Sequence, residues 1–176
     1  MQYVRQTGSN VKPVVAWLLL AIGSLLFLGL IVAAPLALAN GHEALAYNIY
    51  RPFSYFCHQI PARSFFIAQY PFAVCSRCTG IYAGFLGATV VYPFFRSLRR
   101  TNTPARKWLL IAALPLAIDF SVEFFGIWNN THFSRFATGA LLGSAAVFYV
   151  LPGLLELSLR ERKRKPPVTD LPPQEN

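Results

Sequence analysis

The sequence predicts an all-α membrane protein with four transmembrane helices, cytoplasmic termini and a Cys/His-containing extracytoplasmic loop between the first two helices. Of its 176 residues, 55% are hydrophobic and only 13% are charged, so the chain has too little polar surface to cover a soluble globular fold. Its apolar residues form four continuous blocks, each near the length of about 20 residues that crosses a bilayer. Continuous blocks favour helices over the alternating pattern of a membrane β-barrel.

The predicted membrane domain covers residues 14–157, and its helices span residues 14–39, 72–95, 108–128 and 136–157. The first block is uncharged, whereas the third contains Asp119 and Glu123. The first block ends in Ala37-Leu38-Ala39 and therefore resembles a signal peptide with a cleavage site. It is longer than the hydrophobic region of a signal peptide, which has about 7 to 15 residues, so we expect an uncleaved first helix.

The distribution of lysine and arginine predicts the orientation. Ten of the 16 basic residues lie in the connection between the second and third helices or after residue 157, and such residues accumulate on the cytoplasmic side. Residues 1–13 carry two more and are expected there too, which leaves residues 40–71 and 129–135 outside. The net charge of +9 then reflects orientation and contact with anionic lipid, and we expect no nucleic-acid binding. Residues 158–176 are basic, then proline-rich, and predict a disordered tail.

Residues 43–56 combine aromatic and aliphatic side chains with few charges. This composition is typical of the membrane interface. An interfacial helix and a loop with aromatic anchors fit it equally well.

Three cysteines, Cys57, Cys75 and Cys78, are the only ones in the chain, and His58 follows the first. The C-x-x-C spacing is typical of metal sites, and the four donors together would suit a tetrahedral zinc ion. Adjacent Cys57 and His58 cannot easily bind one metal together. His58 could therefore support the site from outside, while Asp119 or His132 completes it or the fourth position stays open.

Two other interpretations of the cysteines remain. Cys75 and Cys78 could form a redox pair at a helix N-terminus, where the helix dipole and Arg77 lower a thiol pKa, with Cys57 as the resolving thiol. This layout is similar to that of disulfide-generating membrane enzymes, which would require a quinone, but those enzymes use two cysteine pairs. Alternatively, a structural disulfide could staple a non-catalytic scaffold. Motifs of ordinary hydrolases are absent from the sequence.

Asp119 and Glu123 are four residues apart and therefore share one helix face. Charges inside a bilayer are costly and normally have partners, and Arg77 and Arg135 at the outer ends of their helices are the obvious candidates. A rise of 1.5 Å per residue places Asp119 about 16 Å and Glu123 about 22 Å along their helix from Trp108. We expect either a functional polar pocket below the cysteines or a plain ion pair that fixes helix packing.

Glycines predict which helices approach most closely. Gly80 and Gly84 form a G-x-x-x-G step in the second predicted helix, and Gly139 and Gly143 form another in the fourth. Such steps let helix backbones pack tightly in membranes.

The strings CHQIPARSFF at residues 57–66 and CSRCTGIY at residues 75–82 resemble the signature of a widespread prokaryotic membrane-protein family of unknown function. The similarity continues through the segments around Asp119 and Arg135, and one departure is Phe120, where the family tends to have glycine. The resemblance implies a small multi-pass protein of the inner or plasma membrane and transfers no activity.

The predicted site therefore has two parts. The metal ligands are Cys57, Cys75, Cys78 and His58, with zinc as the expected ion. The supporting polar pocket, partly implied by the resemblance, comprises Gln59, Arg63, Ser64, Arg77, Asp119, Glu123, His132, Arg135 and Thr138. The lipid bilayer is the only expected partner, since the sequence indicates no protein partner.

Overall fold

A computed structural model describes residues 11–163, with side chains from residue 13 to residue 157. The predictions for residues 1–13 and for the tail at residues 158–176 lie mostly outside these described residues. Within the predicted disordered tail, residues 158–163 belong to the last helix. The elements in chain order are α1 (Val11–Ala39), α2 (Glu43–Ser54), the 3₁₀ helix η1 (Pro61–Arg63), β1 (Phe66–Ile67), β2 (Tyr70–Pro71), α3 (Ser76–Phe95), α4 (Lys107–Phe124) and α5 (His132–Lys163).

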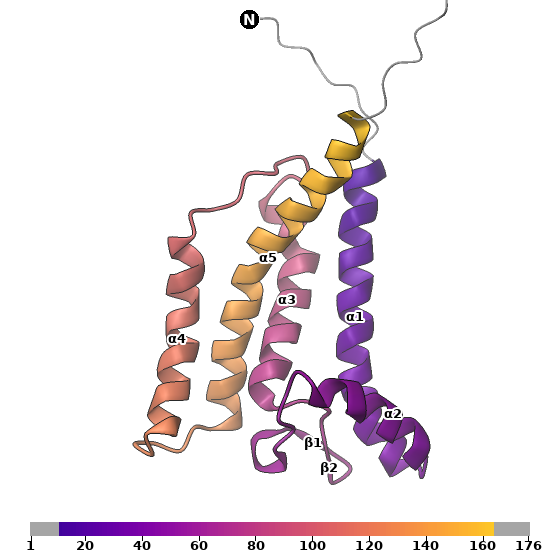
Figure 1. Cartoon of the computed structure of the whole chain (residues 1–176), viewed down its shortest axis with the longest axis vertical. Coiled ribbons are helices and arrows are strands. Elements are labelled where there is room, and N and C mark those ends of the chain that lie inside the picture. Colours follow the sequence, from indigo (N-terminus) through magenta and orange to yellow (C-terminus); the bar gives the residue numbers. More distant parts are fainter. Residues whose placement is uncertain (1–10, 164–176) are drawn as a thin grey trace, which may run out of the picture.

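The four longest helices run along the long axis of the molecule, and the smaller elements gather at one end (Figure 1). That end holds α2, the antiparallel pair of β1 and β2, and the turn between α4 and α5. The connection from α3 to α4 lies at the opposite end, close to the last turns of α5. Residues 43–56 thus form a helix over most of their length, which is one of the two structures that their composition allows.

Three of the described helices are long and apolar enough to cross a membrane, at Pro13–Ala39, Ser76–Phe95 and His132–Leu157. The fold is therefore mostly helical, as predicted. Helix α4 is not one of these three, because its 18 residues carry three charges, on Lys107, Asp119 and Glu123. Many large side chains on the outer faces of the helices are exposed, such as Leu26 on α1 and Leu110 on α4, which suits helices surrounded by lipid.

The helix predicted to end at residue 157 continues to Lys163. Three other helix ends differ from the predicted bounds by four residues, for local reasons. The helix predicted from residue 72 begins at Ser76, because Cys75 is extended (φ −64°, ψ 160°) and acts as the N-cap of α3. The helix predicted to reach residue 128 ends at Phe124, since Gly126 adopts a left-handed φ of 67° and the Ile127 amide donates to the Val122 carbonyl at 3.0 Å.

The helix predicted from residue 136 begins four residues earlier, at His132. Thr131 caps it, because its hydroxyl oxygen accepts a hydrogen bond from the Ser134 amide at 3.1 Å. The polar first turn of α5 lies before the apolar block from which its start was predicted.

Helices α3 and α5 make the most extensive contact in the molecule. A Cβ atom built on Gly80 or Gly84 would lie less than 3.0 Å from the backbone of α5, and one on Gly139 or Gly143 would lie equally close to α3. Ser144 also donates to the Gly84 carbonyl at 3.1 Å. The predicted close packing of these two helices is confirmed.

The other two long helices flank this pair. Helix α1 packs on α3, where the Trp17 indole donates to the Thr89 carbonyl at 2.7 Å. Helix α4 packs on α5 and has no fully buried residue. At the end that carries the loops, the α3–α5 pair therefore has α1 and α2 on one side and α4 on the other.

Candidate functional site

The segment between α2 and α3 folds back over the start of α3 and brings Cys57 to it. The Gln59 side chain connects two parts of this segment, because its amide nitrogen donates to the carbonyls of Tyr50 and Ala73, both at 2.8 Å. The Ser76 hydroxyl donates to the Arg63 carbonyl at 2.9 Å. These bonds link the end of α2, η1 and the first turn of α3 into one unit.

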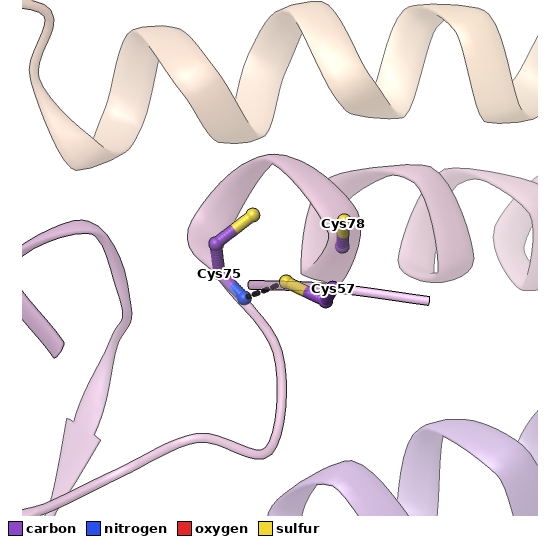
Figure 2. Close-up of side chains that lie close together, drawn as sticks. All are labelled: Cys57, Cys75 and Cys78. Carbon is purple, nitrogen blue, oxygen red and sulfur yellow. Dashed lines mark hydrogen bonds between the residues drawn. The ribbon is translucent and has the colours of Figure 1, made fainter. Parts of the chain in front are cut away.

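The three cysteine sulfurs converge at the N-terminus of α3 (Figure 2). Their Sγ atoms all lie within 4.8 Å of one another, and all three thiols are free. Atoms no further apart than this lie within about 2.8 Å of a common centre, the largest separation divided by √3, whereas a zinc–sulfur bond is about 2.3 Å. A shift of about half an ångström per sulfur would form three such bonds.

The environment of Cys57 favours its thiolate form. The Cys75 amide donates to the Cys57 sulfur at 3.2 Å. Hydrogen bonds from the side chains of Cys75 and Cys78, followed by the backbone amides of Cys75 and Gln59, lower the pKa of Cys57 well below its usual range, although burial opposes them. The thiolate is the form that binds metals, so the lowered pKa favours metal binding by Cys57.

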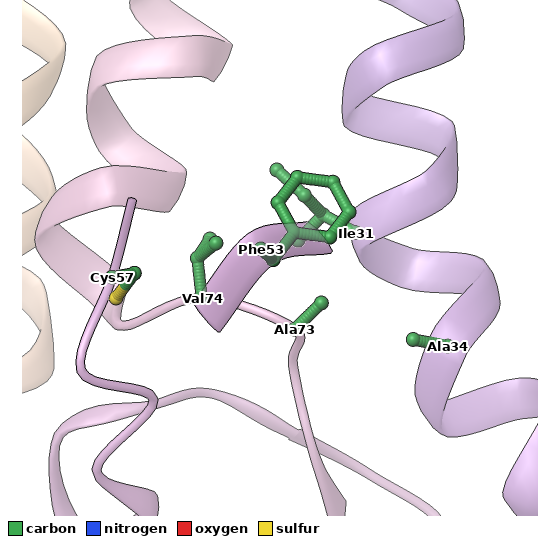
Figure 3. Close-up of a cluster of buried hydrophobic side chains, with 6 residues drawn as sticks. All are labelled: Ile31, Ala34, Phe53, Cys57, Ala73 and Val74. Atoms are coloured by element: carbon green, nitrogen blue, oxygen red, sulfur yellow. The ribbon is translucent and has the colours of Figure 1, made fainter. Parts of the chain in front are cut away.

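Apolar side chains surround the sulfurs. Cys57 belongs to a buried cluster with Ile31 and Ala34 of α1, Phe53 of α2, and Ala73 and Val74 (Figure 3). Cys75 and Cys78 pack against this cluster together with Phe27 and Tyr82. Electrostatic interactions are strong in such surroundings, so a bound cation would be held firmly by the thiolates.

A second group of polar residues forms on the side of α3 that faces α4 and α5. The predicted partners pair here: Arg77 contacts Asp119 at 2.5 Å and Glu123 at 3.5 Å. Arg135 donates hydrogen bonds to both carboxylate oxygens of Glu123, at 2.7 Å and 3.3 Å. Arg63 reaches the same carboxylate from the loop at 2.9 Å. We call these five residues the arginine cluster.

The structure thus divides the predicted site into two groups at one end of α3. His58 is exposed and does not belong to the group of three cysteines. Ser64 and Thr138 donate to nearby backbone carbonyls, and Gln59 is a structural link. The ring of His132 packs 5.8 Å from that of Phe65, and its Nδ1 is buried without a hydrogen-bond partner.

Two contacts to the arginine cluster were not predicted. The Asn130 side chain donates to the Asp119 carbonyl, and the Arg77 guanidinium lies 5.6 Å from the centre of the Phe120 ring. Phe120 is the residue that the sequence set apart as a departure from the family it resembles, which was a usable signal. Asn130 carries no comparable signal, because its contact depends on where the turn after α4 leads the chain.

Comparison with known proteins agrees with this picture. Residues 57–149 match the family described as predicted membrane protein DUF2085. The chain belongs to this family. The match begins at Cys57 and contains both the arginine cluster and the three cysteines, which we call the sulfur cluster. The resemblance found in the sequence to a membrane-protein family of unknown function is confirmed at that level.

Two archaeal relatives extend the comparison. The uncharacterised protein MJ1492 of Methanocaldococcus jannaschii is 37% identical over 125 residues, which cover 71% of this chain and 80% of the relative. An uncharacterised protein of Methanothermobacter thermautotrophicus is 35% identical over 105 residues, 58% of this chain and 93% of the relative. No solved structure matches the chain.

Proposed function

We propose that this protein is a multi-pass membrane protein that binds one zinc ion through Cys57, Cys75 and Cys78 at its extracytoplasmic face. The observation that carries the proposal is the convergence of three free sulfurs within 4.8 Å of one another. Thiolates select zinc and similar thiophilic ions over magnesium or calcium.

Three protein ligands leave the fourth zinc position to water or to an external ligand. His58 lies beside Cys57 but is exposed and outside the group, and both acids of α4 are engaged by arginines. A zinc ion with three protein ligands and an open position is typical of sites that activate water or bind a substrate. The sulfur cluster is therefore proposed as a site of chemistry rather than a closed structural site.

Four membrane spans with both termini in the cytoplasm fit this arrangement best. Helix α4 runs beside α5 (Figure 1), and its 18 residues extend about 27 Å, close to the bilayer core of about 30 Å. Arginines offset the cost of its two carboxylates. The arginines that follow α3 then lie on the cytoplasmic side, and the sulfur cluster lies outside the inner or plasma membrane.

Elemental analysis of the purified full-length protein in detergent tests the metal site. We expect one zinc per chain, and we expect each of Cys57→Ser, Cys75→Ser and Cys78→Ser to lose it, because two thiolates bind zinc far more weakly than three. His58→Ala is the matched control and should retain the ion. Protein with three titratable thiols that takes up no zinc would contradict the proposal.

A thiol–disulfide oxidoreductase is the second candidate, favoured by the C-x-x-C pair at the N-cap of α3 and by the lowered pKa of Cys57. Thiol counting before and after reduction separates it from the metal site. Two thiols that appear only after reduction, in protein without metal, would exclude the metal site and show a disulfide, and turnover with a quinone would then separate the redox function from a structural disulfide.

A further inference from the structure

The arginine cluster carries one positive charge more than its acids can neutralise. Arg63, Arg77 and Arg135 contribute three charges, and Asp119 and Glu123 offset two. Of the other described charges at this end of the molecule, Arg51 and Glu43 of α2 cancel each other. A Cys57 thiolate would lie in the apolar cluster with α1 and α2, not in the arginine cluster. Arginine cannot lose its proton in a protein, so the excess charge is permanent.

Most of this charge is withdrawn from solvent. The side chains of Asp119, Arg135, Glu123 and Arg77 are 8%, 9%, 10% and 14% exposed. The Nε atom of Arg77 is also buried without a hydrogen-bond partner. Burying an uncompensated charge and leaving a buried donor without an acceptor both cost free energy. One bound anion would neutralise the excess positive charge and bring hydrogen-bond acceptors to the arginine cluster.

Arg63 is the member of the arginine cluster whose side chain is accessible to solvent. The Arg63 side chain is 44% exposed, and it contacts Glu123 through an oxygen that Arg135 already binds. An anion can therefore bind to Arg63 while Arg135 keeps its hydrogen bonds to both oxygens of Glu123. Arginine side chains match the planar oxygen pairs of phosphate and carboxylate groups.

The position of the cluster indicates what kind of anion it meets. Arg77 and Arg135 lie in the first turns of α3 and α5, where those helices enter the membrane. The neighbouring α4–α5 turn exposes Phe125 and Trp128, at 72% and 70%, and exposed aromatic side chains are typical of the headgroup layer. A phosphodiester there carries a single negative charge, which equals the excess.

We infer that the arginine cluster is an anion site for a phosphate group, with the phosphodiester of a lipid headgroup entering beside Arg63. This site is separate from the sulfur cluster and does not depend on a bound metal. Free phosphate shares the recognised chemistry, so the test must distinguish the two sources.

Thermal unfolding of the full-length protein in detergent provides that test, with dioctanoyl phosphatidylglycerol, dioctanoylglycerol and inorganic phosphate as probes. A ligand that binds the folded state raises the unfolding temperature. We expect phosphatidylglycerol to raise it and the phosphate-free lipid not to. Arg63→Gln should weaken the apparent affinity about tenfold, while Arg51→Gln, which removes an exposed arginine of α2, should not change it.

Arg63→Lys keeps the charge and should retain most of the affinity, which separates loss of binding from loss of folding. A response to inorganic phosphate that also depends on Arg63 would support the site and assign it to soluble phosphate. The inference is overturned if dioctanoylglycerol acts like phosphatidylglycerol, or if Arg63→Gln responds to the lipid as Arg51→Gln does.

Discussion

Gln59 shows how a single residue positions the sulfur cluster. Its backbone is in the left-handed region, at φ 50°, which turns the chain two residues after Cys57. Its side chain then bonds the carbonyls of Tyr50 and Ala73 and holds Cys57 beside Cys75. The precision of the three-sulfur arrangement therefore depends on a residue that contributes no ligand.

Gln59→Ala should lower the unfolding free energy by about 1–3 kcal/mol, because two hydrogen bonds are lost and two partly buried carbonyls lose their donor. Thermal unfolding in detergent measures the change, and zinc affinity should fall with it. Ser54→Ala is the control, since it removes only a local bond to the Arg51 carbonyl on an exposed surface. Equal stability of the two variants would show that Gln59 has no special role.

The spacing of the cysteines predicted that their three sulfurs would lie together, as they do, but it did not predict the position of His58. A C-x-x-C pair at the start of a helix constrains two sulfurs by local geometry alone. The direction of His58 depends instead on the turn at Gln59 and on the bonds that Gln59 makes to distant residues, which no local pattern reports. Arg63 was predicted in the loop, but its contact with Glu123 also required the tertiary fold.

At the scale of the elements, the α3–α5 pair is the rigid part of the molecule. Four glycines remove the side chains that would separate the two backbones. This contact sets the height of Cys78 and Arg77 on α3 relative to Arg135 on α5. Both polar groups therefore depend on the same helix packing.

Gly84→Ala should destabilise the protein by about 1–3 kcal/mol, because the added methyl group meets the backbone of α5 at Ala140. Gly87→Ala lies one turn further along α3, where nothing stands within 4 Å of the new atom, and should have almost no effect. Unfolding temperatures of the two variants check this difference. If both variants lost a similar amount of stability, α3 would be sensitive to substitution in general, and close packing at Gly84 would not be the cause.

The sequence predicted these long helices well because apolar length and glycine spacing are local signals. It predicted their outer ends less well, since those ends are set by single residues such as Thr131, which caps α5, and Gly126, which ends α4. The β1–β2 pair, with two residues in each strand, carried no hydrophobic period to reveal it.

For the whole molecule, the topology decides which compartment the two polar groups face. The basic connection between α3 and α4 lies at the opposite end from the sulfur cluster (Figure 1). The four spans that we propose would place these ends on opposite sides of the membrane. The charged residues of α4 make this helix the weakest of the four sequence signals, so it is the element to test.

Asn129→Cys and Asn102→Cys test whether α4 crosses the membrane, because these exposed residues lie beyond its two ends. In intact cells, a membrane-impermeant maleimide should label position 129, while position 102 should react only after permeabilisation. The unmodified chain supplies the background from the native thiols. Equal labelling of both positions in intact cells would mean that α4 does not cross.

The two parts of the site expected from the sequence lie on different sides of α3, because Cys78 packs toward α1 and α2 and Arg77 contacts Asp119 of α4. Arg77 and Cys78 are adjacent in sequence, and a helix turns about 100° per residue, which directs neighbouring side chains to different faces. The sulfur cluster and the arginine cluster therefore share a helix end without sharing a ligand.

Zinc K-edge X-ray absorption of the zinc-loaded, full-length protein tests the central claim most directly. The account predicts three sulfur scatterers at about 2.3 Å and one nitrogen or oxygen scatterer near 2.0 Å. A first shell of nitrogen and oxygen atoms alone, or one that is unchanged in Cys57→Ser, would contradict it.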